Sequence, residues 1–269
     1  MANFQVDKTA IQAIRSLIGG LQNSQLQKKL NQLHYADIAE IIQELSIDEA
    51  VYIIKLLNSA KTADALAELD EDIREGILKQ LSVKEIVGEI EELDTDDAAD
   101  LLSELPEARQ EKVFDQINDE TLAGDLRELL NYEENTAGGL MAKELVKVQE
   151  ELSVLKCVNT MRAQAENVTR VHSIYVVDSK NRLKGRLSLK DLITANSRAI
   201  VKDISIPNVD FVTSNQEGEE VARIMTKYDL EAIPVVNDKK ELLGRITIDD
   251  IVDFIKDEAE EDYLLAAGV

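Results

Sequence analysis

The segment Ile174–Ile193, IYVVDSKNRLKGRLSLKDLI, decides the fold because it returns 59 residues later as IPVVNDKKELLGRITIDDIV, Ile233–Val252. Eight of the twenty aligned positions are identical. Each copy reads as a strand, a polar turn, a second strand and a helix that opens near Ser188 or Thr247. Helical patterns precede both copies, at Leu152–Met161 and Glu219–Tyr228. The repeat predicts a tandem α/β module whose two sheets pack face to face with pseudo-twofold symmetry.

A junction, Tyr132–Met141, reads YEENTAGGLM and separates this repeat from a different pattern upstream. Gly138 and Gly139 permit a positive φ or a close backbone approach, and Asn135 with the flanking acids suits a turn. The segment therefore predicts a boundary between two domains.

Upstream of the junction, residues His34–Leu129 divide without insertions into eight consecutive blocks of twelve. In most blocks positions 5, 8, 9 and 12 are apolar, which is the spacing of one helix face. The first position is mostly a residue type that caps helices, namely Ser46, Asn58, Asp70, Ser82, Asp94 and Asn118, with Pro106 as the variant. Ser46 with Glu49 and Ser82 with Glu85 fit capping boxes. The blocks predict short helices, each capped anew, that stack as a small superhelix of the kind used for interaction or scaffolding.

Residues 1–33 predict two more amphipathic helices. Ile11, Ile14 and Ile18 lie on one face of the first, which Gly19 and Gly20 should end. The second should cover residues 22–33, because Leu26, Leu30 and Leu33 share a face.

The formal net charge is −23, and its distribution along the chain is uneven. Residues 34–105 carry 20 acids and 5 bases, a net −15, and residues 217–262 carry 15 acids and 6 bases, a net −9. Such a charge disfavours a general affinity for nucleic acid or anionic lipid. Two acidic surfaces in adjoining domains repel each other if they face one another, although a solvated surface is the ordinary role of any single acid.

Other compositional features point to a soluble, cytoplasmic chain. No apolar run approaches the ~18 to 20 residues that cross a bilayer, and the N-terminus lacks a signal-peptide pattern. Cys157 is the single cysteine, which excludes an intramolecular disulfide and favours a buried structural thiol. His34 and His172 have no partners at metal-ligand spacing, so each is expected to be a surface or packing residue.

The two copies resemble a pair of CBS domains, in which the second strand runs into a G-x-x-[ST]-x-x-D motif. The matching residues are Gly185, Ser188 and Asp191 in the first copy and Gly244, Thr247 and Asp250 in the second. The resemblance implies that the hydroxyls can meet a nucleotide phosphate at a helix start and that the aspartates can hold ribose hydroxyls. Many CBS pairs bind no nucleotide, and Ser188 and Thr247 can equally be helix caps alone.

The order of parts closely resembles the cytosolic portion of the MgtE family of magnesium channels and transporters, over essentially all of the chain. The resemblance implies a fold of an N-terminal superhelix of short helices, a tandem CBS pair and the start of a connecting helix. The expected domains are an acidic helical domain at 1–131, the junction at 132–141, CBS domains at 142–200 and 201–256, and the connecting helix at 257–269. It also implies a homodimer formed through the CBS domains, at the cytoplasmic face of the cell membrane. The five-helix membrane pore domain of the family is missing from these residues, so a soluble fragment of a multi-pass membrane protein is expected.

The same resemblance implies that cytosolic Mg²⁺ binds between the helical domain, the CBS pair and the connecting helix. Carried over by position, its ligands are Asp64, Asp96, Asp100, Gly139 through its carbonyl, Glu217, Thr226, Asp229, Asp250, Glu258, Glu261 and Asp262. Asp64 and Glu217 exchange one acid for the other relative to the family, and Thr226 replaces a small residue that contributes a carbonyl. Asp96 and Asp100 are four residues apart, so one helix face carries both, and a bridging cation relieves their repulsion.

The implied function is a Mg²⁺ sensor that gates a magnesium transporter, with the pore closed when Mg²⁺ bridges the domains. One alternative is a regulatory module that binds ATP or another adenine nucleotide through Ser188, Asp191, Thr247 and Asp250. Against it, Ser173 and Leu230 stand where nucleotide-binding relatives often place aromatic residues. A second alternative is a scaffold without metal. An enzyme is not expected, because no nucleophile, base and oxyanion donors converge in the sequence.

The dimer interface of the resemblance is expected on helices of both copies. Val158, Met161, Val221, Ile224 and Met225 give these helices more apolar surface than two sheets need for cover. The alternative is that these side chains fill the core of each CBS domain.

Overall fold

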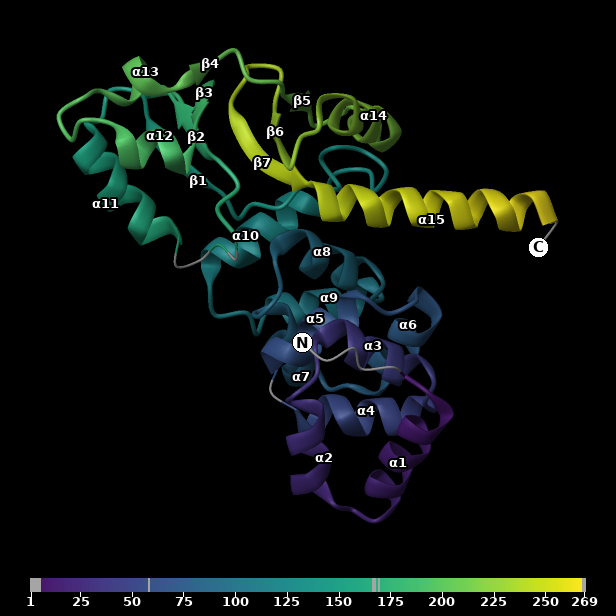
Figure 1. Cartoon of the computed structure of the whole chain (residues 1–269). Helices are drawn as coiled ribbons and strands as arrows, with labels where there is room; N and C mark the ends of the chain where they lie inside the picture. The colour runs from purple at the N-terminus through teal and green to yellow at the C-terminus, as the bar shows by residue number, and fades with distance from the viewer. Residues whose placement is uncertain (1–5, 58, 166–167, 169, 268–269) are drawn as a thin grey trace. The chain divides into compact units, whose positions relative to one another are not determined.

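The computed structural model describes residues 6–57, 59–165, 168 and 170–267, without the side chains of residues 59, 260–262 and 264–267. The chain forms two compact units, Met1–Leu126 and Arg127–Val269. Each unit has its own arrangement of elements (Figure 1). Across the described part of the chain, no helix has both the length and the hydropathy needed to cross a membrane.

The first unit is helical. Its elements are α1 (Lys8–Gly19), α2 (Asn23–Leu30), α3 (Tyr35–Gln43), α4 (Ile47–Leu56), α5 (Ser59–Ala67), α6 (Glu71–Gln80), α7 (Val83–Ile90), α8 (Thr95–Ser103), α9 (Glu107–Phe114) and α10 (Glu120–Leu129), the last of which enters the second unit. From α3 to α10 each block of twelve forms one helix, as predicted.

Helix caps explain why each block stops and restarts. Ser46 and Ser82 form the predicted capping boxes with Glu49 and Glu85, in which the serine accepts the third backbone N–H and the glutamate accepts the serine N–H. His34 forms a third box with Asp37, which sequence reasoning missed. The expected cap at Asn58 lies outside the described residues.

Alternate helices of the stack pack against each other: α3 contacts α5, α5 contacts α7, α7 contacts α9, and α4 contacts α6. The apolar face of each block fills the space between them. Ile38, Ile41 and Ile42 of α3 and Leu101 and Leu102 of α8 are buried. The stack is therefore held by the same four positions that repeat in the sequence.

The second unit combines helices with two sheets. Its elements are β1 (Val146–Gln149), α11 (Val154–Gln164), β2 (Ile174–Val177), β3 (Leu183–Leu187), α12 (Leu189–Thr194), α13 (Val201–Ile204), β4 (Ile206–Pro207), β5 (Val212–Thr213), α14 (Gly218–Tyr228), β6 (Ala232–Val236), β7 (Leu242–Thr247) and α15 (Ile248–Ala267). The sheet orders are β1-β2-β3-β4, drawn from teal to green in Figure 1, and β5-β6-β7, drawn from green to yellow.

The sequence repeat is also a repeat of strand register. Ile174 pairs with Leu187 in the first copy, and Ile233 pairs with Ile246 in the second, so both partners move by 59 residues. Each hairpin has its irregularity at the same place, between Val176 and Val177 and between the equivalent valines of β6. The predicted pseudo-symmetry is thus present in the backbone pairing.

The two copies exchange short flanking segments. Residues 206–207 form β4 on the first sheet, although they lie in the range expected for the second CBS domain. In the opposite direction, Ala142 bridges Arg245 of β7, and the junction donates hydrogen bonds from Ala137 and Gly138 to the carbonyls of Gln216 and Ser214, both at 2.8 Å. Each sheet is therefore completed by a segment from beyond its own repeat.

The motif glycines make room for these exchanged segments. A Cβ at Gly185 would lie 2.5 Å from the Ile206 carbonyl oxygen, and one at Gly244 would lie 2.6 Å from that of Ala142. Real Cβ atoms do not approach backbone oxygens so closely. The glycine of the G-x-x-[ST]-x-x-D motif is thus required in both copies by a neighbouring backbone.

The helix residues expected at the dimer interface differ in how deeply they are buried. Val221 and Met225 of α14 are buried, and Val158 and Met161 of α11 pack against the core of the first copy. Cys157 lies in that core as a buried free thiol, as predicted, and burial raises its pKa. Val221 and Met225 therefore follow the core-filling alternative, whereas Val158, Met161 and Ile224 are only partly buried, so the expected contact surface stays a prediction for them.

Candidate metal and nucleotide sites

In the motif of the first CBS copy, Ser188 caps the start of α12. The Ser188 hydroxyl donates to the Asp191 carboxylate at 2.6 Å and accepts from the Asp191 N–H at 3.0 Å. Both side chains are half-buried. Ser188 therefore acts as a helix cap here.

The second motif repeats this arrangement and adds a carboxylate. Asp250 accepts from the Thr247 N–H at 2.8 Å and from the Thr247 hydroxyl at 2.6 Å, and the same hydroxyl also approaches Asp249. One hydroxyl proton serves one carboxylate at a time. Burial raises the pKa of Asp250, against the hydrogen bonds from Thr247. Burial also acts to raise the pKa of Asp249, but the Thr247 hydroxyl and nearby Arg170 and His172 hold it below its ordinary value.

Arg170 and His172 are site residues that sequence reasoning did not assign. They precede β2 of the first copy, yet their charges act on Asp249 of the second. His172 Nδ1 also lies 3.9 Å from Glu231, which precedes β6. The sequence repeat could have pointed to these two residues. If the two copies pack face to face, the start of one hairpin lies near the motif of the other.

The junction forms one end of the predicted metal region. Thr136 forms an isolated antiparallel β-bridge with Glu217, the residue that precedes α14. The N–H of Gly218 donates to the Asn135 carbonyl at 2.8 Å. Gly139 lies on the same turn, where a Cβ would meet the carbonyl oxygens of residues 133 and 134 within 2.6 Å. The structure thus brings Gly139 and the exposed Glu217, two of the predicted ligands, into one neighbourhood.

The start of α15 and its middle reach different ends of α14. The Ile248 N–H donates to the Glu231 carbonyl just after α14 ends, whereas Phe254 lies so close to Gly218 that a Cβ there would be 2.6 Å from its ring. Glu258 is one helical turn beyond Phe254 and is half-buried. Glu258 therefore lies on the same face of α15 as Phe254, the face that meets Gly218.

Other predicted ligands lie at the opposite end of α14. Thr226 and Asp229 are both exposed, and Asp229 has a positive φ of 52° as it ends the helix. Twelve residues separate Asp229 from Glu217, which is roughly 18 Å along a helix. One ion cannot bind both directly. The side chains of Glu261 and Asp262, also predicted as ligands, lie outside the described residues.

In the helical unit, Asp64 lies on α5 and Asp96 and Asp100 lie on α8. Asp64 is half-buried, and burial followed by the nearby charge of Asp94 raises its pKa. Asp96 is half-buried and Asp100 is exposed, one turn further along α8. Asp94, which the sequence predicts only as a helix cap, is a further acid of this region because its charge acts on Asp64. Its place at the start of the block that contains Asp96 and Asp100 could have indicated this.

Within the described part of the chain, no three acidic, histidine or cysteine side chains converge closely enough to hold a metal ion. The predicted ligands are mostly carboxylates and backbone carbonyls, spread over α5, α8, the junction, the two ends of α14 and α15. Oxygen donors of this kind suit Mg²⁺, which keeps several waters and uses one or two carboxylates at a time. Oxygen ligands spread in this way fit weak binding of a largely hydrated Mg²⁺ better than a closed metal cage.

Comparison with protein families matches both units. A model of the MgtE intracellular N domain covers residues 33–135, and a model of the CBS domain covers residues 137–198 and 201–257. The magnesium transporter MgtE of Thermus thermophilus is 45% identical over 134 residues, which are 50% of this chain and 30% of the relative. That of Enterococcus faecalis is 38% identical over 141 residues, 52% of this chain and 31% of the relative. The matches thus span about a third of these curated relatives.

Two solved structures agree with nearly the whole fold. The cytosolic domain of the Mg²⁺ channel MgtE in complex with ATP has a TM-score of 0.82 and 35% identity, over 90% of this chain and 99% of the other. The soluble part of a magnesium transporter has a TM-score of 0.80 and 29% identity, over 93% of this chain and 98% of the other. Both predicted architectures, the short-helix stack and the CBS pair, are confirmed by these structures.

Proposed function

Because this chain belongs to the MgtE family, as an intracellular N domain joined to a pair of CBS domains, we propose that it senses Mg²⁺ and gates a magnesium transporter. The observation that carries the proposal is the match to the MgtE cytosolic domain over 99% of that structure. In this proposal the chain works at the cytoplasmic face of the membrane and acts on a pore domain of the same transporter. No catalytic step is assigned to it.

The mechanism is electrostatic. The acids of residues 34–105 and 217–262 carry net charges of −15 and −9, so the two acidic regions repel when Mg²⁺ is scarce. Mg²⁺ bound among Asp64, Asp96 and Asp100 and among Gly139, Glu217 and Glu258 reduces that repulsion. Conformations that bring more carboxylates to each ion bind it better, so rising Mg²⁺ favours a compact state. That compact state is the one that closes the pore.

The test measures the radius of gyration of this chain by X-ray scattering from zero to ~20 mM Mg²⁺, a range suited to weak carboxylate sites. The radius should fall with Mg²⁺ and far less with KCl at equal ionic strength, because simple screening does not bridge carboxylates. Replacing Asp96 and Asp100 by Asn should weaken the effect. A radius that ignores Mg²⁺ would contradict the proposal.

Glu40→Gln with Glu44→Gln is a matched control for that double variant. Glu40 lies on α3 and Glu44 is the C-cap of the same helix, four residues further on, and both acids are exposed and lie in the same unit as Asp96 and Asp100. The control removes the same charge without touching the predicted ligands. An equal loss of compaction in both variants would show a general charge effect and would remove Asp96 and Asp100 from the site.

Nucleotide binding by the CBS pair is a second candidate function. It is supported by the similarity to an MgtE cytosolic domain solved with ATP and by the hydroxyl–aspartate pairs of the two motifs. Asp191→Asn should weaken ATP binding measured by calorimetry if the first motif holds the ribose. The Asp96 and Asp100 double variant should leave ATP binding intact, which separates the nucleotide site from the metal site.

We further propose that the chain dimerises through apolar side chains on equivalent helices of the two copies. Leu189 and Ile193 of α12 are 40% and 81% exposed, and their equivalents Ile248 and Val252 of α15 are 36% and 45% exposed. Exposed apolar residues at corresponding sites of both copies suit the self-complementary face of a twofold dimer. They add to the partly buried Val158, Met161 and Ile224 of α11 and α14 as candidate interface residues.

A further inference from the structure

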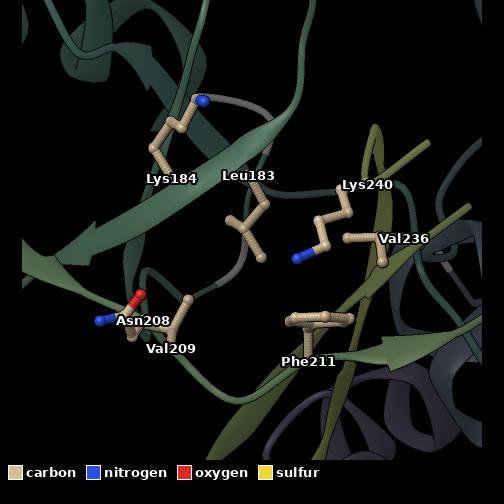
Figure 2. Close-up of a pocket in the computed structure, with 7 residues that line it drawn as sticks. All are labelled: Leu183, Lys184, Asn208, Val209, Phe211, Val236 and Lys240. Atoms are coloured by element: carbon tan, nitrogen blue, oxygen red, sulfur yellow. The ribbon is translucent and has the colours of Figure 1, made fainter. Parts of the chain in front are cut away.

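The end of the CBS pair away from the two motifs has a cavity of about 80 Å³. It lies among Leu183 and Lys184 of β3, Asn208, Val209 and Phe211 between β4 and β5, Val236 of β6 and Lys240 of the β6–β7 turn (Figure 2). A water needs roughly 10 to 15 Å³ of such space, so this cavity has room for several waters or one small ring.

The cavity is separate from the motif residues. In the second copy, Thr247 pairs with Ala232 at one end of the hairpin, whereas Val236 pairs with Leu242 at the other. Four residues of extended strand correspond to roughly 13 Å. The motif threonine and the cavity therefore occupy opposite ends of the same two strands.

The Lys240 ammonium points into this cavity, toward Leu183 and the face of Phe211 (Figure 2). It lies 5.3 Å from the centre of the Phe211 ring, within the range of a cation–π contact. Among the described residues it pairs with no carboxylate, in a chain with 53 acids and 30 bases. Lys184, by contrast, is turned away and lies 3.4 Å from Asp178.

The first CBS copy has different residues at the positions equivalent to Lys240 and Phe211. Asn181 corresponds to Lys240, and both have a positive φ, of 58° and 62°. Asn181 uses its amide to donate to the Leu242 carbonyl at 2.8 Å, which secures the turn. Asparagine is favoured at such a φ and lysine is not. Leu152 stands where the second copy has Phe211. The cation and the ring are thus both particular to the second copy.

We propose that this cavity binds a small organic anion that carries a flat apolar group, with its phosphate or carboxylate on Lys240 and its ring against Phe211. Leu183, Val209 and Val236 supply the apolar walls, and an anion pairs with an ammonium that no acid among the described residues reaches. The Leu183 N–H donates to the Lys240 carbonyl at 2.9 Å, so the ligand lies where the hairpins of the two copies meet. Its binding stabilises that contact and hence the CBS pair.

The test is a titration of the full chain with phenyl phosphate, followed by NMR and calorimetry. We expect chemical-shift changes at Phe211, Val236 and Lys240, weaker binding of inorganic phosphate because it lacks the ring, and none of benzyl alcohol because it lacks the charge. Lys240→Gln should weaken phenyl phosphate binding by about tenfold or more. Lys240→Arg should retain it, and Phe211→Leu should reduce it.

Lys239→Gln is the matched control, because Lys239 is the exposed neighbour in the same turn and does not line the cavity. It should bind phenyl phosphate as the unchanged chain does. Equal losses in Lys239→Gln and Lys240→Gln would reduce the effect to general charge. Shifts confined to Ser188, Asp191, Thr247 and Asp250, or no binding to a folded chain, would overturn the proposal.

Discussion

Glu89 is a buried carboxylate in the helical unit, only 5% exposed on α7. The Thr62 hydroxyl donates to it at 2.7 Å. Burial raises its pKa to about 7, against this hydrogen bond and with help from the charges of Glu92 and Glu85. The proton is therefore bound more tightly in the folded chain than in the unfolded chain.

Such a group stabilises the fold at low pH and loses its contribution as pH rises. Because the unfolded pKa is near 4.5 and the folded one is about 7, the free energy of unfolding should fall by roughly 3 kcal/mol from this residue over that window. Glu89→Gln should remove the fall and make the chain more stable than the unchanged one at pH 8. Urea unfolding at pH 5 and pH 8 measures both.

The exposed Glu40 on α3 provides the control for this pH experiment. Glu40→Gln removes the same charge from the surface and should leave the pH dependence of the unchanged chain in place. A pH profile of Glu89→Gln that parallels the unchanged chain would contradict the assignment of a neutral, buried carboxyl at Glu89.

At the scale of elements, the exchanged segments depend on two glycines. Gly185 faces the carbonyl of Ile206 on β4, and Gly244 faces that of Ala142 before β1. Replacing either by Ala should force the strands apart or displace the added segment, at a cost of about 1 to 3 kcal/mol of unfolding free energy. Gly88→Ala and Gly124→Ala are controls, because a Cβ at either helical position meets nothing within 4 Å.

These controls should be neutral or stabilising, since Ala favours a helix over Gly by roughly 0.5 to 1 kcal/mol. Chemical unfolding separates the two groups. If Gly244→Ala unfolded at the same urea concentration as the unchanged chain, the close approach of residue 142 would have no energetic weight.

At the scale of the whole molecule, the association state tests the exposed apolar residues of the CBS pair. Ile193→Asp combined with Val252→Asp places charges on both equivalent helices, and burying them in an interface is unfavourable. The dimer dissociation constant from sedimentation equilibrium should rise by at least roughly 30-fold. The unchanged chain should form a tighter dimer with Mg²⁺, because the bound cation lowers the net negative charge of each subunit.

Leu21→Asp is the control for association, because Leu21 is 73% exposed and lies between α1 and α2 of the other unit. It should leave the dissociation constant unchanged. A double variant that dimerises as well as the unchanged chain would place the interface elsewhere. A chain that stays monomeric at high concentration with Mg²⁺ would remove the dimer from the proposal.

The sequence by itself determined the local structure, because local structure depends on periodicity and caps. Every block from His34 to Leu129 formed its helix, since the apolar spacing is a property of neighbouring turns and Ser46 and Ser82 bond to residues three positions away. The 59-residue repeat likewise determined two hairpins of one register. The candidate ligands could be named from the resemblance, and their shared helix faces from spacing alone.

Tertiary structure decided what residues far apart in sequence do to each other. Only the fold shows that residues 206–207 complete the first sheet, that Val221 and Met225 are core, and that Gly139 lies near Glu217 but far from Asp229. Only the fold turns Lys240 toward Phe211. The physical reason is that a residue's local pattern specifies its strand or helix and its face, whereas the partner across that face comes from another part of the chain. Burial, pKa shifts and cavities all depend on that partner.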